Sequence, residues 1–260
     1  MIHFDLSRRF FRVWQRNFVV YQKTWKIGFI PPLLEPLFYL AAFGVGLGVM
    51  VGRIDYAGSN IPYPAFIAPA LIAINVMQSA FFETTFASFV RMFYQKTFDG
   101  MLATPLSVDE IITGEILWGG TKSVIGTVLM MLVITAFGLL SFPDALLLLP
   151  IAFLGGLAFA CAGMICTAIV PTIEVFNLPI FLFVTPMFLF GGTFFPLSNL
   201  PNWAQLVAYT LPLTHLVALC RGVALGGLHG HLFYSALYLV LWITLFFPLA
   251  IYLMRRRLIK

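Results

Sequence analysis

The chain has 260 residues, of which 61% are apolar and only 10% charged, and its mean hydropathy is +0.97. Soluble domains carry about 25% charged and about 45–50% apolar residues, so this composition excludes an ordinary soluble domain and indicates a membrane protein. The net charge of +5 does not indicate nucleic-acid binding, because the basic residues lie at the ends of apolar segments, where they orient helices. Three scattered cysteines without a CxxC pattern predict neither disulfides nor a metal site.

The first segment, residues 4–26, mixes aromatic and basic side chains. Aromatic residues such as Trp14 and Phe18 would cover one side of a helix, and arginines such as Arg12 and Arg16 the other. This pattern is typical of a helix that lies in the headgroup layer of a membrane. We therefore predict an amphipathic interfacial helix over 4–26, with a solvated basic tail as the alternative. We expect no removable signal peptide, because no short apolar run ends in a small-residue cleavage site.

The rest of the chain is dominated by apolar segments that approach or exceed the roughly 20 residues needed by a membrane-spanning helix. Residues 196–231 are also apolar, but Pro201 and Pro212 interrupt them. We expect 200–228 to form a re-entrant pair of short helices rather than a seventh span, since broken backbone is tolerated at membrane depth only where protein buries it or where it lines a cavity. The chain is predicted to be a single all-α, polytopic transmembrane domain, 1–260, with six spans at 29–52, 63–90, 111–138, 146–170, 177–195 and 232–254.

Lys and Arg are distributed unevenly between the two sides of this predicted bundle. With six spans, the N-terminal segment, the loop at 91–110 and the C-terminal tail share one side and carry twelve of them. The other side carries two, Arg53 and Arg221. Cytoplasmic loops carry an excess of Lys and Arg, so we expect both termini to be cytoplasmic.

Ionisable residues also occur inside the predicted spans. Glu83 lies in the middle of the second span, close to Asn75 and Gln78. A charged group in hydrocarbon costs about 2.5–3.5 kcal/mol on insertion scales, so it usually faces a cavity or a partner. Two interpretations stay open for Glu83: it lines a polar pathway, or it holds helices together. For Glu35, near the start of the first span, we favour a structural role. Lys122 in the third span could pair with either acid.

The stretch FDGMLATPLSVDEI, residues 98–111, gathers Asp99, Asp109 and Glu110 on the predicted cytoplasmic side. Its Thr-Pro step should end a short helix. Ser107 and Glu110 then form the S-x-x-E pattern of a capping box, which predicts the start of the next helix. A short cytoplasmic helix with acids could pair with basic residues of a partner protein; an ordinary solvated loop is the alternative.

Motifs for nucleotide, metal or catalytic chemistry are not recognised in the chain. GEILWGGTKS, residues 114–123, departs from the phosphate-loop pattern GxxxxGK[ST], because Thr121 separates Gly120 from Lys122. His229 and His231 flank a loop glycine and are interpreted as solvated. We therefore predict no catalytic residue, no metal site and no bound cofactor.

Three blocks together resemble the ABC type-2 exporter permeases, the membrane subunits of bacterial ATP-driven exporters. They are the basic amphipathic start, FDGMLATPLSVDEIITGE between spans two and three, and GGTFFPLSNLPNWAQLVAYTLPLTHLVALCRGVALG before span six. The segment PYPAFIAPALIAINVMQSAFFETTFASFVRM is similar to the branch that includes lipo-oligosaccharide, or nodulation-factor, exporters. The resemblance covers essentially the whole chain.

The resemblance implies a transport subunit without enzyme activity of its own, in the bacterial plasma (inner) membrane. Two copies of the chain would pair with a dimer of ATP-binding cassette ATPase subunits, which would bind ATP and Mg and hydrolyse the nucleotide; no nucleic acid is involved. A coupling helix over 92–106 would dock on the ATPase. The residues implied for ATPase coupling are Asp99, Met101, Leu102, Thr104, Pro105, Leu106, Asp109, Glu110 and Glu174.

The resemblance also implies a pathway lined by spans two and five, with the segment 200–228 as an outer gate. An amphiphilic substrate (a lipid-linked or lipo-oligosaccharide, a polysaccharide or a drug) would leave the cytoplasm or the inner leaflet by this pathway. The implied pathway residues are Asn75, Gln78, Phe82, Glu83, Phe86, Phe183 and Phe190. The implied gate residues are Pro196, Trp203, Pro212, His215 and Arg221.

Two other classes of function stay open at this point. A proton-coupled secondary transporter would use Glu83 and would work without an ATPase, although the inverted repeats common in such proteins are not evident. A membrane-embedded lipid-modifying enzyme would need a constellation of polar residues at one membrane face, and the sequence does not suggest one.

Overall fold

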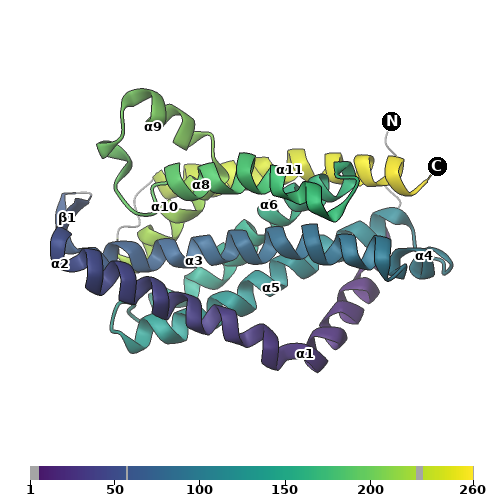
Figure 1. Ribbon diagram of the computed structural model, residues 1–260, viewed down its shortest axis with the longest axis horizontal. Coiled ribbons are helices and arrows are strands. Elements are labelled where there is room, and N and C mark those ends of the chain that lie inside the picture. Colours follow the sequence, from purple (N-terminus) through teal and green to yellow (C-terminus); the bar gives the residue numbers. More distant parts are fainter. Residues whose placement is uncertain (1–5, 57, 227–230, 260) are drawn as a thin grey trace.

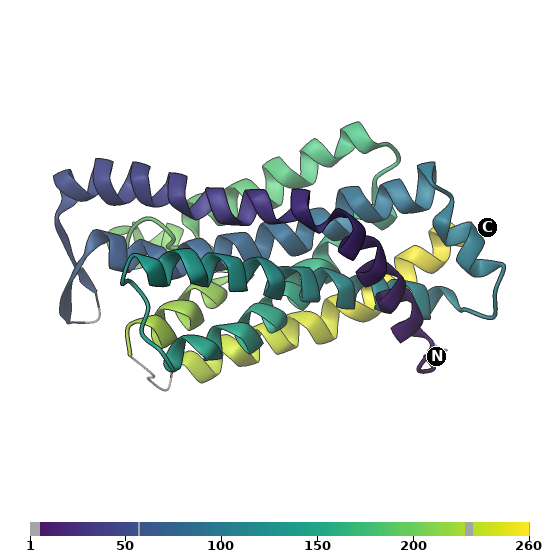
Figure 2. The ribbon, with the colours of Figure 1, turned by 90° about the horizontal axis from the view of Figure 1, so that it is seen from below.

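The computed structural model describes residues 6–56, 58–226 and 231–259. They form an elongated bundle of helices, with one small β-hairpin at one end (Figures 1 and 2). The first described residues, the short helix α4 and the C-terminal end of α11 lie at the opposite end (Figure 1). The predicted class, an all-α polytopic membrane protein, is confirmed.

The first helix is longer than predicted. α1 (Phe10–Tyr39) runs without a break from the predicted interfacial segment into the first span, which continues through η1 (Leu40–Leu47) and α2 (Gly48–Val51). Residues 4 and 5 of that predicted segment lie outside the described residues. α1 is visibly bent (Figure 1) and contains three prolines, whose missing N–H groups interrupt the helical hydrogen bonds.

The N-terminal arm of α1 packs on the bundle through part of its aromatic side, whereas Phe11 and Trp25 stay exposed. The Trp14 indole donates a hydrogen bond to Thr121 (2.8 Å), and the Tyr21 ring contacts Trp118 edge to face, with centroids 5.5 Å apart. α1 can approach this closely because residue 114 is glycine: a Cβ there would lie 2.5 Å from the Val13 Cβ.

The connection after the first span is a hairpin that the sequence did not predict. β1 (Arg53–Tyr56) pairs antiparallel with β2 (Ser59–Pro62). The second span then runs through α3 (Tyr63–Phe82), η2 (Glu83–Ala87) and η3 (Val90–Tyr94). Lys96 adopts a left-handed backbone conformation (φ 53°) and breaks the helix. The predicted coupling helix over 92–106 is therefore shorter in the structure, as α4 (Thr97–Leu102).

The third helix begins where the capping box predicts. The Ser107 hydroxyl accepts a hydrogen bond from the Glu110 N–H (3.2 Å), and the Glu110 carboxylate accepts one from the Ser107 N–H (2.9 Å). This box opens α5 (Val108–Ala136). The chain continues through η4 (Asp144–Leu147), α6 (Leu148–Ile169), η5 (Ile173–Phe176), α7 (Asn177–Pro179), η6 (Ile180–Val184) and α8 (Thr185–Phe190).

The predicted broken segment consists of two short helices after η7 (Leu197–Asn199). α9 (Asn202–Tyr209) and α10 (Pro212–Ala224) meet at an angle of 86°. At about 1.5 Å per residue, neither helix alone would cross a membrane. Residues 227 and 228 of the predicted segment lie outside the described residues. α11 (His231–Leu258) closes the bundle.

Six helical segments of the described chain are long and apolar enough to cross a membrane. The second is 78% buried over its most apolar window, whereas the first and the fifth are only 12% and 17% buried. The core therefore lies between α3, α5 and α6, and the first and fifth spans are peripheral. The six segments are Gly28–Val51, Tyr63–Tyr94, Val108–Ala136, Asp144–Ile169, Ile173–Phe190 and Leu232–Leu258.

Candidate functional site

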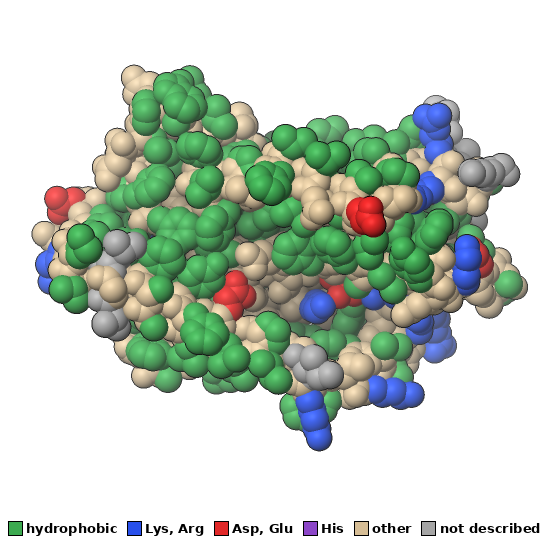
Figure 3. Space-filling model, viewed as in Figure 1, with side chains coloured by type: hydrophobic (Ala, Val, Ile, Leu, Met, Phe, Trp, Pro, Cys, Tyr) green, Lys and Arg blue, Asp and Glu red, His purple; other side chains and the backbone are tan. Residues whose placement is uncertain are grey.

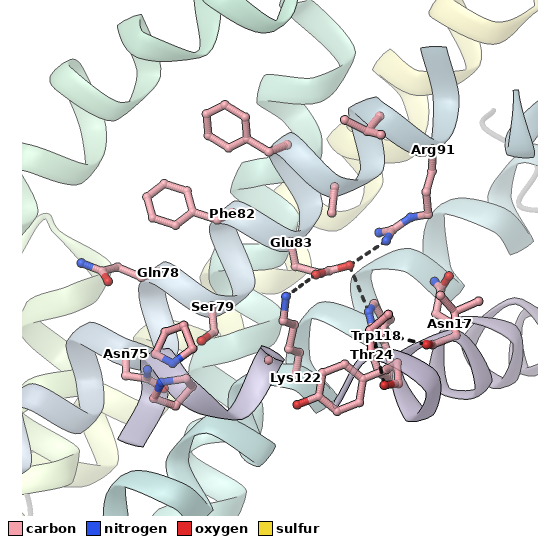
Figure 4. Close-up of a pocket in the computed structure, with 18 of the residues that line it drawn as sticks. Asn17, Thr24, Asn75, Gln78, Ser79, Phe82, Glu83, Arg91, Trp118 and Lys122 are labelled. Carbon is pink, nitrogen blue, oxygen red and sulfur yellow. Dashed lines mark hydrogen bonds and ion pairs between the residues drawn. The ribbon is translucent and has the colours of Figure 1, made fainter. Parts of the chain in front are cut away.

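A cleft of about 660 Å³ opens between α1, the second span and α5. Figure 3 shows acidic and basic side chains within a hollow on this face of an otherwise largely apolar surface. Figure 4 shows Glu83 near the middle of the cleft, with Arg91 and Lys122 directed toward it from two different helices. The cleft therefore places a set of charges inside the apolar bundle.

Glu83 is the hub of these charges. Its Oε1 accepts hydrogen bonds from Arg91 Nη1 (2.8 Å) and from the Trp118 indole (3.0 Å), and its Oε2 pairs with Lys122 Nζ (2.6 Å). The Glu83 side chain is only 5% exposed, whereas that of Lys122 is 35% exposed. Lys122 is thus the cation of this pair that can also reach a molecule in the cleft.

A second buried acid, Glu115 on α5, continues the network. Its Oε2 accepts hydrogen bonds from Arg91 Nη2 (2.5 Å) and from the Ser88 hydroxyl (2.6 Å). Its Oε1 accepts one from the buried Asn17 amide on α1 (2.8 Å). The arm of α1 is therefore joined through Asn17, Glu115 and Arg91 to the second span.

Two residues of the α1 arm line the mouth of the cleft. Burial lowers the pKa of the Arg16 guanidinium, and the charge of Glu115 opposes that shift. Burial raises the pKa of the Tyr21 hydroxyl, and the charge of Glu83 adds to the rise. At neutral pH Arg16 stays a cation, and Tyr21 keeps its proton and can donate a hydrogen bond.

On the side of Glu83 away from Arg91, aromatic and polar groups line the cleft (Figure 4). Phe82 and Phe86 line it together with Gln78 and Glu35. Asn75 also lines it, and the Asn75 Oδ1 atom is buried without a hydrogen-bond partner. The cleft thus combines charged groups with aromatic rings, a combination that suits an amphiphilic ligand.

The cleft brings together five of the seven residues predicted for the pathway: Asn75, Gln78, Phe82, Glu83 and Phe86. Phe183 and Phe190 do not line it. The Phe183 ring packs instead against Phe81 and Trp242, with centroids 5.9 Å and 6.3 Å away.

The residues predicted for ATPase coupling divide into a surface group and a buried pair. Asp109 forms an ion pair with Arg255, and Glu110 is bonded to Ser7 and Ser107. These two carboxylates lie at the start of the helix α5, are buried and are bonded within the chain, so their predicted role in ATPase coupling would be indirect. Asp99, Thr104, Pro105 and Glu174 are exposed, and Met101, Leu102 and Leu106 are half-buried.

The predicted gate residues lie around α9 and α10. Arg221 is buried and donates hydrogen bonds to the carbonyls of Phe66 (3.1 Å), Gly192 (2.6 Å) and Thr193 (2.7 Å). His215 stacks on the Tyr238 ring, with centroids 4.0 Å apart. Pro196 precedes η7, Pro212 begins α10, and Trp203 on α9 is 64% exposed.

The site prediction missed Arg91, Glu115, Trp118 and Asn17. Glu115, Trp118 and Lys122 occur at positions i, i+3 and i+7, so one face of α5 carries all three. This spacing inside an apolar helix was the signal that could have found Glu115 and Trp118. No sequence signal pairs Asn17 with Glu115, because the two residues lie on helices far apart in the chain.

Residues 8–225 match the model of the family described as ABC-2 type transporter. The chain belongs to this family, and with its six candidate membrane-spanning helices it is a multi-pass membrane permease. The resemblance drawn from the sequence is thereby confirmed.

Three relatives show which members of this family the chain is similar to. Nodulation protein J of Sinorhizobium fredii (strain NBRC 101917 / NGR234) is 38% identical over 252 residues, covering 95% of this chain and 93% of that protein. Nodulation protein J of Rhizobium meliloti (strain 1021) is 36% identical over 248 residues, covering 95% and 92%. The inner membrane transport permease YadH of Escherichia coli (strain K12) is 23% identical over 214 residues, covering 82% of each chain.

Proposed function

We propose that this chain is the membrane-spanning subunit of an ATP-driven exporter for an amphiphilic substrate, which it moves out of the cytoplasm or the inner leaflet. The main supporting observation is the cleft, whose lining contains the cations Lys122 and Arg16 as well as the aromatic rings of Phe82 and Phe86. A lipid-linked or lipo-oligosaccharide fits this combination of charged and aromatic groups, and a polysaccharide or a drug with a polar group fits part of it. The similarity to nodulation protein J favours the lipo-oligosaccharide.

ATP would be supplied by a separate ATPase dimer, since the chain carries no recognised phosphate loop. The helix α4 and the exposed Glu174 would contact that dimer, and a second copy of the permease would complete the assembly. Lys and Arg side chains gather toward the end that holds α4 (Figure 3), which supports a cytoplasmic position for this end and both termini in an inner membrane.

The competing role of Glu83 as a proton carrier is disfavoured by its contacts. The Glu83 carboxylate forms ion pairs with both Arg91 and Lys122. Proton uptake would break both pairs and leave two cations with fewer partners in an apolar bundle, which is costly. These contacts favour a role for Glu83 in joining the helices that line the cleft over a role as a proton carrier.

The test is co-purification from native membranes in mild detergent, with every associated protein identified. We expect a soluble subunit with a GxxxxGK[ST] loop at a fixed ratio to the permease. Asp99→Lys, which reverses an exposed charge on α4, should reduce that association, whereas Asp144→Lys, an exposed acid in η4, should leave it intact. A chain that purifies alone and moves substrate into vesicles without ATP would contradict the proposal.

A further inference from the structure

A second cavity, of about 600 Å³, lies at the hairpin end of the bundle. β1, the segment after α8, η7, the end of α9, α10 and the start of α11 all contribute to its walls. It shares no lining residue with the charged cleft. Its volume falls in the usual range for sites that bind small molecules.

The walls of this outer cavity combine tyrosines with short polar side chains. Tyr209 and Tyr234 line it and are 54% and 67% exposed, so their rings are available to a ligand. Thr214 lines it from α10 and is 4% exposed, and its hydroxyl has no hydrogen-bond partner. Buried polar atoms are nearly always paired, so this hydroxyl can take up a hydrogen bond with a molecule in the cavity.

The two charges at the cavity are of opposite sign. The buried guanidinium of Arg221 lines it and would repel a cation. Asp55 on β1 also lines it, has no ion pair among the described residues and would repel an anion. A charged ligand attracted by one of these groups is repelled by the other and also loses the hydration of its own charge. A neutral molecule with many hydroxyl groups does not lose the hydration of a charge and can bond to polar side chains of the wall.

We propose that this outer cavity binds a neutral saccharide unit. A sugar ring has an apolar C–H face, which would lie on Tyr209 or Tyr234, and an edge of hydroxyls, which would bond to Thr214, Asp55 and Ser235. The inference rests on the proposed function in one respect: in an exporter whose termini are cytoplasmic, this end faces outward and would hold the sugar part of a cargo before release.

The test uses the full chain in lipid nanodiscs and three β-1,4-linked tetramers: of glucose, which is neutral, of glucosamine, which is cationic, and of glucuronic acid, which is anionic. Binding is measured by isothermal titration and by saturation-transfer NMR. We expect the glucose tetramer to bind at least about fivefold more tightly than either charged one, because a charged tetramer loses hydration of its charges, and a net cost of roughly 1 kcal/mol has that effect.

Variants locate the site. Tyr234→Ala should weaken binding of the glucose tetramer about tenfold, the usual scale for one aromatic contact. Thr214→Val should weaken it without lowering thermal stability, because the variant removes a buried hydroxyl that has no partner.

A charge variant tests the selectivity. Asp55→Asn should raise affinity for the glucuronic acid tetramer and leave affinity for the glucose tetramer within about twofold, since only the charge changes. Tyr252→Ala, an exposed tyrosine on the same helix as Tyr234 but outside the cavity lining, is the matched control and should change nothing.

Absence of binding by the glucose tetramer, or preference for a charged tetramer, would overturn the inference. Binding that survives Tyr234→Ala and Thr214→Val unchanged would overturn it as well. The ATPase association is tested separately, by co-purification of the same protein without sugar. If the ATPase subunit still co-purifies, failure of sugar binding does not contradict the proposed exporter function.

Discussion

The two ends of the bundle hold buried cations in different ways. At the α4 end, Arg91 is held by two carboxylates, Glu83 and Glu115, which come from the second span and from α5. At the hairpin end, Arg221 is held by three backbone carbonyls and by the face of the Phe66 ring, 3.7 Å from its guanidinium carbon. The first arrangement depends on side chains and the second on backbone.

This difference teaches where the molecule can rearrange. Side-chain ion pairs between helices can exchange partners when the helices shift, as Arg91 could between its two acids. Backbone carbonyls move only with their own segments, so Arg221 fixes the segment after α8 to α3 and α10. In the proposed exporter, the side-chain network lies on the side of the ATPase and the backbone-held arginine on the side of release.

Loss of Glu83 should have the largest effect. Glu83→Ala removes a partner from both Arg91 and Lys122 and leaves the Trp118 indole without its acceptor. Breaking a buried pair costs about 3–5 kcal/mol, so we expect a large fall in the free energy of unfolding. Thermal unfolding in nanodiscs measures it. The control is Glu174→Ala, which removes an exposed acid and should leave the free energy of unfolding unchanged. Equal stabilities of the two variants would mean that the Glu83 ion pairs do not stabilise the fold.

Replacing each arginine by lysine tests the comparison directly. Arg221→Lys keeps the charge but cannot reach three separated carbonyls or stack flat on Phe66, so we expect a loss of about 2–3 kcal/mol. Arg91→Lys can keep one carboxylate and should lose about 1 kcal/mol. Chemical unfolding of both variants measures how much each substitution lowers the free energy of unfolding. A larger loss at Arg91 than at Arg221 would reverse our account of the two ends.

Much of the fold could be predicted because membrane spans are long and their apolar runs are plain. The capping box at Ser107 is confirmed for a similar reason, since it depends on residues only three positions apart. The hairpin was missed because each strand has only four residues, so the alternation of polar and apolar residues in Arg53–Tyr56 is too short to stand out from the surrounding sequence. The break at Lys96 was missed because lysine rarely takes a left-handed conformation.

The site could be predicted only in part, because sequence fixes a face of a helix but not its neighbour. Glu83 and Lys122 were both recognised, and their pairing stood as one of two options for Lys122. Arg91 was not connected to Glu83 across eight positions. The i→i+5 bonds of η2 and η3 change which side chains share a face, and an α-helical pattern does not anticipate this change.

The link between α1 and the network gives a smaller effect at the same end. Asn17→Leu removes the donor to Glu115 Oε1 and leaves that buried oxygen short of a partner. We expect a loss of about 1–2 kcal/mol and faster amide exchange in the α1 arm, measured by hydrogen–deuterium exchange. Gln15→Leu, exposed on the same helix, is the matched control. Unchanged exchange in Asn17→Leu would show that the other contacts of the arm, such as Trp14–Thr121 and the packing at Gly114, hold it without Asn17.

The capping box at α5 should give the smallest effect and separates local from network stabilisation. Ser107→Ala removes the side-chain acceptor for the Glu110 N–H, and a lost N-cap costs about 1 kcal/mol, whereas Ser107→Gly costs only a few tenths. Glu110 keeps its bonds to Ser7 in both variants. If chemical unfolding shows a loss like that of Asn17→Leu or larger, the box must also position Asp109 for Arg255, and the α4 end would be one coupled network rather than a set of separate contacts.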